Sequence, residues 1–94
     1  MTNEEMRNYL IQRFIQLGRS EERHQLNKIE YKENHKIKKA KEEQEWENEY
    51  NSRKLEIINL YAKFEGISFS TACHELHGLA YQVERNYENN SITL

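Results

Sequence analysis

The chain has 94 residues, a formal net charge of −2 and a hydrophobic content of 36%, which together allow one small domain with a thin core. Its single cysteine, Cys73, excludes an internal disulfide. The sequence shows neither a signal peptide nor a long apolar run, so we expect a cytoplasmic protein of a bacterial cell with no membrane segment. Because it contains no glycine-rich phosphate loop and no aspartate, we expect no enzyme activity and no cofactor.

The composition favours helix almost everywhere. All 16 acidic residues are glutamate, proline is absent and glycine occurs three times, whereas aspartate, glycine and proline are the poor helix formers. The sequence therefore predicts a single all-α domain, with a short N-terminal helix, a long charged central helix and a C-terminal helix after a glycine turn. We expect these helices to form a small helical bundle or an antiparallel coiled-coil dimer.

The first helix is predicted over residues 3–17. Thr2 or Asn3 can cap its N-terminus, and apolar side chains recur every three or four residues along one face. Gly18 follows the last of them, and a glycine just beyond a helix commonly adopts the left-handed conformation that ends it. We therefore expect a break at Gly18.

The central helix is predicted over residues 20–65, because the 47 residues between the first two glycines contain no proline. Its middle is strongly polar, so a break near residues 41–45 is the alternative. The charge changes sign abruptly in this region. Residues 23–41 carry a net charge of +5, and residues 42–49 carry five glutamates and no base.

This charge reversal favours helix pairing. If two copies pair antiparallel about an axis between Lys41 and Glu42, the lysines of each copy face the glutamates of the other, whereas parallel pairing brings like charges together. Two alternatives stay open: a charge run on a solvated helical face, and a surface complementary to a different protein. The apolar seam of the homodimer would consist of Leu26, Ile29, Ile37, Trp46 and Ile57.

The third helix is predicted over residues 69–88, followed by a frayed tail at 89–94. Within residues 54–86, the succession of Ala62, Gly66, Ile67, a serine-rich helix start and Leu76 resembles a helix-turn-helix. No lysine or arginine precedes Arg85 in this helix, which departs from the DNA-binding pattern. The resemblance implies DNA contacts from this helix and phosphate contacts from the basic block, through Ser70, Thr71, His74, His77, Lys36, Lys38, Lys39 and Lys41.

Cys73 and His77 are four residues apart and therefore lie on one helical face. Both residue types ligate zinc, but zinc needs three or four ligands, and no second pair lies nearby in sequence. We therefore expect no metal site and interpret Cys73 as a small apolar packing residue.

The acidic block supplies the expected partner-binding residues. Trp46 is the largest apolar side chain in the most polar region, and aromatic side chains concentrate binding energy. We therefore expect a non-enzymatic regulator that binds another protein through Glu42, Glu43, Glu45, Trp46, Glu47, Glu49 and Tyr50.

The class of partner follows only by analogy. Small, catalytically blank helical proteins are common products of phages and mobile elements, where anti-CRISPR proteins and similar inhibitors occlude host enzymes. We therefore expect the partner to be a host nuclease or another nucleic-acid enzyme with a basic channel. The alternatives are a dimeric helix-turn-helix-like transcriptional regulator that binds DNA, and a structural coiled-coil adaptor.

Overall fold

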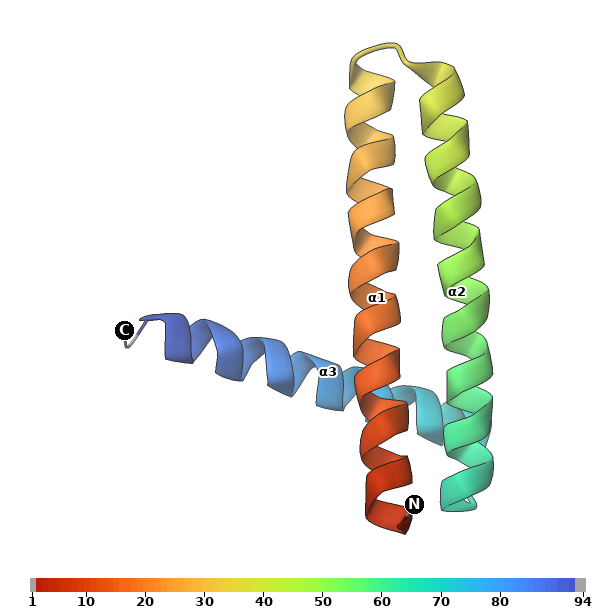
Figure 1. Cartoon of the computed structure of the whole chain (residues 1–94), viewed down its shortest axis with the longest axis vertical. Coiled ribbons are helices and arrows are strands. Elements are labelled where there is room, and N and C mark those ends of the chain that lie inside the picture. Colours follow the sequence, from red (N-terminus) through yellow and green to blue (C-terminus); the bar gives the residue numbers. More distant parts are fainter. Residues whose placement is uncertain (1, 93–94) are drawn as a thin grey trace. The chain divides into compact units, whose positions relative to one another are not determined.

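The computed structural model describes the backbone of residues 2–92 and the side chains of residues 2–85. This part of the chain forms three α-helices and no strand: α1 (Asn3–Glu33), α2 (Ile37–Glu65) and α3 (Phe69–Ile92) (Figure 1). The predicted all-α class with three helices is confirmed. The two connections, residues 34–36 and 66–68, are short.

Helix α1 begins where the capping signal predicted. The backbone N–H of Glu5 donates to Thr2 Oγ1 at 3.1 Å, and that of Met6 donates to the Thr2 carbonyl at 3.0 Å. Glu4 and Glu5 lie in the first turn, where negative charge stabilises the positive end of the helix dipole.

The predicted helix end at Gly18 is wrong, because α1 continues through this residue to Glu33. A glycine inside a helix costs only about 1 kcal/mol relative to alanine, which a helix of 31 residues accommodates. The predicted long helix over residues 20–65 is also wrong. It is interrupted at residues 34–36, and the alternative break near residues 41–45 does not occur.

The break at residues 34–36 is a Schellman motif built on a histidine. His35 has a φ of 59°, in the left-handed region. Its N–H donates to the Lys32 carbonyl at 3.1 Å, and the N–H of Lys36 donates to the Tyr31 carbonyl at 2.7 Å. These two bonds satisfy the last carbonyls of α1 and reverse the chain direction. Histidine is among the non-glycine residues most often found in this conformation.

The predicted turn at Gly66 is confirmed. Gly66 has a φ of 68°, and the N–H of Ile67 donates to the Ala62 carbonyl at 3.0 Å. Ser68 then caps α3, because its Oγ accepts the N–H of Thr71 at 3.1 Å. Helix α3 runs to Ile92, past the predicted end at residue 88. Of the predicted frayed tail, residues 89–92 are helical, and residues 93–94 lie outside the described part.

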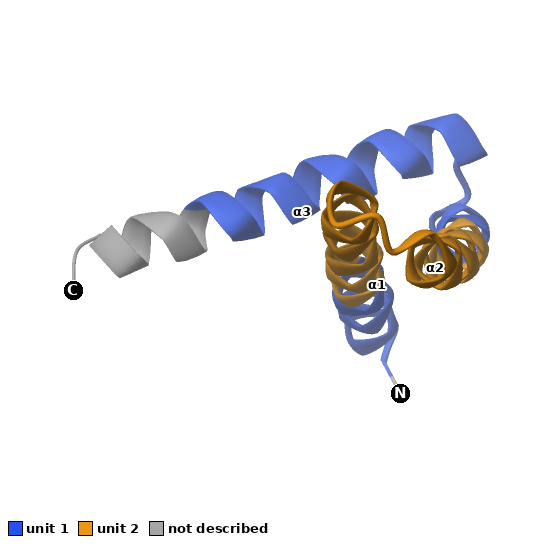
Figure 2. Cartoon of the chain, turned by 90° about the horizontal axis from the view of Figure 1, so that it is seen from above, with its two compact units in different colours: residues 1–14, 57–94 blue, residues 15–56 orange. Residues whose placement is uncertain are grey.

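The chain divides into two compact units, which Figure 2 colours separately. Unit 1 comprises residues 1–14 and 57–94, so it contains segments of all three helices. Its Tyr61 and Leu76 side chains are fully buried. The remaining buried apolar side chains of unit 1 are Leu10, Phe14, Ile57, Ile58, Ala62 and Ala72.

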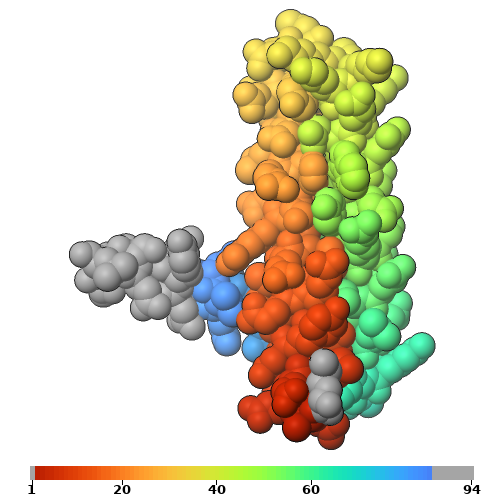
Figure 3. Space-filling model, viewed as in Figure 1, coloured from red at the N-terminus to blue at the C-terminus, as the bar shows by residue number. Residues whose placement is uncertain are grey.

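Unit 2, residues 15–56, is a helical hairpin. Its two arms, one from α1 and one from α2, run antiparallel on either side of the turn at residues 34–36. In Figure 3 the side chains of the arms, orange to yellow-green, meet along the hairpin. Only Ile15, Leu17 and Ala40 are buried apolar side chains here, so polar contacts hold much of this unit together.

Candidate protein-binding surface

Helical periodicity divides the acidic block into two groups. Glu43 and Glu47, four residues apart, face the other arm of the hairpin. There the Glu43 carboxylate pairs with His24 Nδ1, and Glu47 Oε2 lies 2.7 Å from Lys28 Nζ. The other three glutamates, Glu42, Glu45 and Glu49, are exposed on the opposite side of α2.

Further polar contacts join the two arms along the hairpin, and we call the whole series of contacts between the arms the ladder. Lys28 Nζ also donates to Gln44 Oε1 at 2.8 Å. Farther from the turn, Lys54 Nζ lies 3.6 Å from Glu21 Oε1. The attraction between the basic and acidic blocks was expected to act between two chains. For Glu43 and Glu47 it acts within one chain, across the hairpin that turns at residues 34–36.

Trp46 belongs to an aromatic stack with His24 and Tyr50. The His24 ring is nearly parallel to both of its neighbours, with centroids 5.9 Å from Trp46 and 5.5 Å from Tyr50 and an interplanar angle of 16° to each. Trp46 and Tyr50 are 6.2 Å apart. Trp46 is 50% exposed, so the stack supports the indole while leaving about half of its surface open.

A shallow groove runs beside the indole on the exposed side of α2. It is lined by Glu45, Trp46, Glu49 and Arg53 and has a volume of about 430 Å³. The Arg53 guanidinium donates to Glu49 Oε1 at 3.1 Å and lies 5.4 Å from the Tyr50 ring centroid, in cation–π range. The groove therefore places two carboxylates and one guanidinium beside an aromatic surface.

Two residues of this surface were missed by the sequence analysis, His24 and Arg53. Arg53 could have been found, because it follows Glu49 by four residues on a predicted helix. His24 could not, because its position opposite Trp46 depends on the turn at residues 34–36, which was not predicted.

The residues of the predicted dimer seam do not form one line. Leu26, Ile29 and Ile37 are exposed in unit 2. Ile57 is buried in the core of unit 1. The predicted seam requires a helix that is continuous through residues 34–36. The chain turns there instead, so these residues do not lie along one helix.

The side chains implied in DNA contact fall into two groups. On α3, Ser70, Thr71, His74 and His77 are all exposed, and the His77 ring also packs edge-on against Phe14 with centroids 5.0 Å apart. The lysines belong to unit 2 rather than to the unit that contains α3. They are exposed at the hairpin turn and in the first turns of α2, and they comprise Lys36, Lys38, Lys39 and Lys41.

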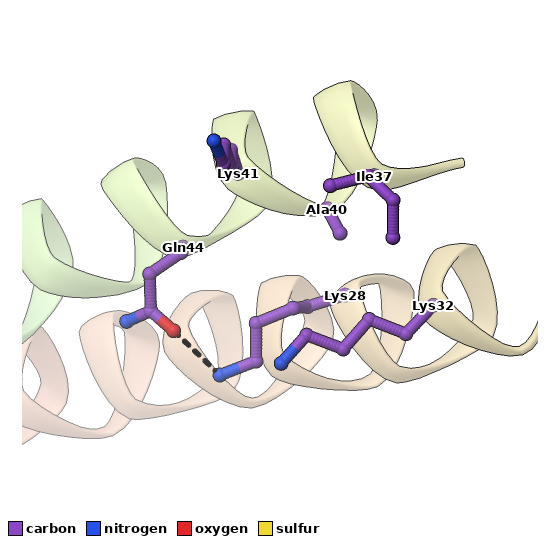
Figure 4. Close-up of a pocket in the computed structure, with 6 residues that line it drawn as sticks. All are labelled: Lys28, Lys32, Ile37, Ala40, Lys41 and Gln44. Carbon is purple, nitrogen blue, oxygen red and sulfur yellow. Dashed lines mark hydrogen bonds between the residues drawn. The ribbon is translucent and has the colours of Figure 1, made fainter. Parts of the chain in front are cut away.

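A second hollow of about 260 Å³ lies beside the hairpin turn (Figure 4). Ile37 and Ala40 point from α2 toward α1, and the Lys28 and Lys32 side chains extend along α1 beneath them. Lys28 is already bonded to Gln44 and Glu47. The hollow therefore has a small apolar surface next to lysine amines, and the Lys28 amine is already hydrogen-bonded within the chain.

In unit 1, a polar contact is built on the buried Tyr61. Its hydroxyl donates to Glu75 Oε2 at 3.0 Å, and the Arg7 guanidinium, which pairs with Glu65 at 3.1 Å, lies beside it. Burial raises the pKa of the Tyr61 phenol, and the neighbouring Arg7 partly offsets this effect. The contact joins all three helices of unit 1 and is structural in character.

Residues 2–92 contain no helix that is long and apolar enough to span a bilayer. No three His, Cys or Glu side chains of the described residues gather as a metal-binding group. Cys73 is half-buried. No protein-family model, curated protein or solved structure matches this chain.

Proposed function

We propose that this protein is a non-catalytic regulator that binds another protein through one side of α2. We call this side the acidic face and define it as Glu42, Glu45, Trp46 and Glu49. The observation that carries the proposal is the half-exposed Trp46, supported from within the hairpin by His24 and Tyr50. A large aromatic side chain that is already fixed loses little conformational entropy on binding, so it is suited to anchor an interface.

The charges around Trp46 indicate the chemistry of the partner. Glu42 and Glu45 are exposed on the same side of α2, and Glu49 is paired with Arg53 within the groove. A basic surface complements this arrangement, and carboxylates at its edge would steer association and fix orientation. Enzymes that hold nucleic-acid backbones present such basic surfaces. Occlusion of a nucleic-acid enzyme, in the manner of phage-encoded inhibitors such as anti-CRISPR proteins, is therefore the mode of regulation we propose.

The first test is affinity capture from a nuclease-treated lysate of a low-GC bacterium, read by mass spectrometry. The variant Trp46→Ala removes the anchor. Leu26→Ala is the matched control, because Leu26 is an exposed apolar residue of the same unit on the other helix. We expect one nucleic-acid enzyme to be enriched by the wild type and Leu26→Ala and lost with Trp46→Ala. Equal recovery by all three proteins would reject the acidic face as the binding surface.

The second test concerns charge. Reversal of Glu42, Glu45 and Glu49 to lysine should abolish capture while leaving the helical circular dichroism signal unchanged, because none of the three faces the other arm of the hairpin. The captured enzyme should lose nucleic-acid binding when the wild-type protein is added. Undiminished binding of nucleic acid in the complex would refute occlusion.

A second candidate function is DNA binding by a helix-turn-helix-like segment. The observation that favours it is the Gly66 turn, after which Ser70, Thr71 and His74 are exposed at the start of α3. Fluorescence anisotropy with duplex DNA at about 50 mM salt tests this function, because phosphate contacts weaken steeply as salt rises. Absence of binding at this salt concentration would reject it.

A further inference from the structure

Unit 1 has an apolar groove on its surface, between its segments of α1 and α2. The groove has a volume of about 360 Å³ and is lined by Met6, Tyr9, Leu10, Leu60 and Phe64. Leu10 is buried, whereas Tyr9 is 54% and Leu60 52% exposed. Three- and four-residue spacing places the α1 side chains on one side of that helix, and the same holds for Leu60 and Phe64 on α2.

This groove differs from the scattered apolar exposure that is normal on a protein surface. Four large apolar side chains that are exposed to solvent adjoin one another here, and contiguous apolar patches mark interaction surfaces more often than single residues do. The chain is only 36% hydrophobic. The four exposed side chains of the groove are therefore a substantial share of the large apolar side chains in the sequence.

The charges along α1 change sign on either side of Tyr9. Glu5 lies one helical turn before Tyr9, and Arg13 lies one turn after it. A second α1 laid antiparallel on this surface, with the two Tyr9 residues near the axis, places Glu5 of each copy opposite Arg13 of the other. A parallel arrangement places like charges together. The surface is therefore complementary to itself under a twofold axis.

We propose that a second copy of this chain covers the groove, with its α1 antiparallel and Tyr9 close to the twofold axis. The apolar side chains supply the attraction, and the two Glu5–Arg13 contacts select the orientation. The exposed apolar surface is smaller than the roughly 800 Å² per partner of a standard interface. The dimer is consequently weak, with monomer and dimer in exchange at micromolar protein concentration.

This dimer surface is distinct from the acidic face and from the predicted seam. The groove belongs to unit 1, and the acidic face belongs to unit 2. Substitutions can therefore affect either surface separately, and failure of the dimer leaves the proposed partner binding untouched.

Sedimentation velocity over a hundredfold range of protein concentration tests the dimer. We expect the wild type to shift from monomer to dimer and Leu60→Glu to stay monomeric. Arg13→Glu should weaken dimerisation about tenfold, because the twofold axis converts two attractive contacts into two repulsive ones. The double variant Glu5→Arg/Arg13→Glu should restore it. The matched control Arg23→Glu, an exposed charge on α1 in unit 2, should leave dimerisation unchanged.

A wild type that stays monomeric at the highest concentration overturns the proposal. A dimer that survives Leu60→Glu is formed by another surface and also overturns it. Failure of the double variant to recover, while Arg13→Glu weakens the dimer, rejects the antiparallel arrangement. Circular dichroism of each variant establishes that loss of dimerisation is not loss of folding, and the two variants that change the charge at Arg13 keep the test decisive if Leu60→Glu unfolds.

Discussion

The His24 ring of α1 lies parallel to the Trp46 indole of α2, with centroids 5.9 Å apart and an interplanar angle of 16°. The side chain that we propose as the anchor for a partner is thus positioned by a residue 22 places earlier in the sequence. Glu43 pairs with the same imidazole. A glutamate of the acidic block therefore helps to hold His24, and His24 in turn holds Trp46.

Substitution of His24 by alanine should therefore affect both stability and binding. It removes the stack on Trp46 and leaves the half-buried Glu43 without its partner, which we expect to cost about 1–2 kcal/mol in the free energy of unfolding. The fluorescence anisotropy of Trp46, the only tryptophan, should fall as the indole becomes mobile. His74→Ala, at an exposed position on α3, is the control. Unchanged anisotropy would show that His24 does not hold the indole.

The same substitution at two glycines should have opposite effects. Gly66→Ala should destabilise by about 1 kcal/mol, because Gly66 has a φ of 68°. Gly18→Ala should stabilise by about 0.5–1 kcal/mol, because Gly18 lies inside α1. An added β-carbon meets no atom within 4 Å at either position, so backbone conformation alone decides the sign. Urea denaturation monitored by circular dichroism measures both, and a common sign would contradict this explanation.

Glycine at position 35 should stabilise the protein. His35 has a φ of 59°, and a residue with a β-carbon adopts this conformation at a cost of about 1 kcal/mol that glycine avoids. We expect His35→Gly to raise the free energy of unfolding by several tenths of a kcal/mol, because the greater freedom of glycine in the unfolded chain offsets part of the gain. His35→Val should lower it. Chemical denaturation of the three proteins provides the comparison, and a more stable valine variant would be inconsistent with a left-handed residue here.

Glu47 and Glu49 should differ in how much they contribute to the free energy of unfolding. The Lys28–Glu47 pair has side chains 16% and 18% exposed, so Glu47→Gln leaves a half-buried ammonium with weaker partners and should cost about 1 kcal/mol. The Arg53–Glu49 pair is 44% and 51% exposed, and Glu49→Gln should change stability by less than about 0.5 kcal/mol. Thermal unfolding of the two variants measures the difference. Equal effects would mean that the ladder of unit 2 is as solvated as the outer surface.

Tyr61 should make the protein sensitive to alkaline pH. Burial raises the pKa of its phenol in the folded state, while an unfolded tyrosine titrates near pH 10. Above pH 10 the unfolded chain therefore loses this proton first, and stability falls as pH rises toward the folded pKa. Phenolate absorbance should show one tyrosine that titrates late or only with unfolding, and Tyr61→Phe should remove it. Stability of the wild type that is flat above pH 10 would count against this assignment.

Much of the fold could be predicted from local signals. The capping residue Thr2, the turn at Gly66 and the cap at Ser68 all follow from side-chain chemistry that acts over three or four residues. These signals need no knowledge of the rest of the chain.

The division between α1 and α2 could not be predicted in the same way. Gly18 has the residue type of a helix end but lies inside a helix, while His35 has no glycine signal and ends one. The preference of a single residue is worth about 1 kcal/mol, and pairing of the charged arms on either side of residues 34–36 outweighs it. The adjacent Asn34 and His35, both tolerant of the left-handed region, were the available clue.

The candidate surface was predictable in part. Trp46 and the glutamates near it were identified from their residue types, but which glutamates face outward depends on the position of the turn. Helical spacing separates Glu43 and Glu47 from Glu42, Glu45 and Glu49 without indicating which group faces the other helix. Only the partners His24 and Lys28 settle that question.

The small number of buried apolar side chains in unit 2 implies that the protein does not open uniformly. Unit 1 has an apolar core around Tyr61 and Leu76, whereas unit 2 buries only Ile15, Leu17 and Ala40. Hydrogen exchange should therefore be slowest at amides in the core of unit 1 and faster along the hairpin, and added salt should widen the gap by screening the ladder. The proposed binding surface lies on the more labile unit, so a bound partner should slow exchange most in residues 37–56, well beyond the few side chains it touches.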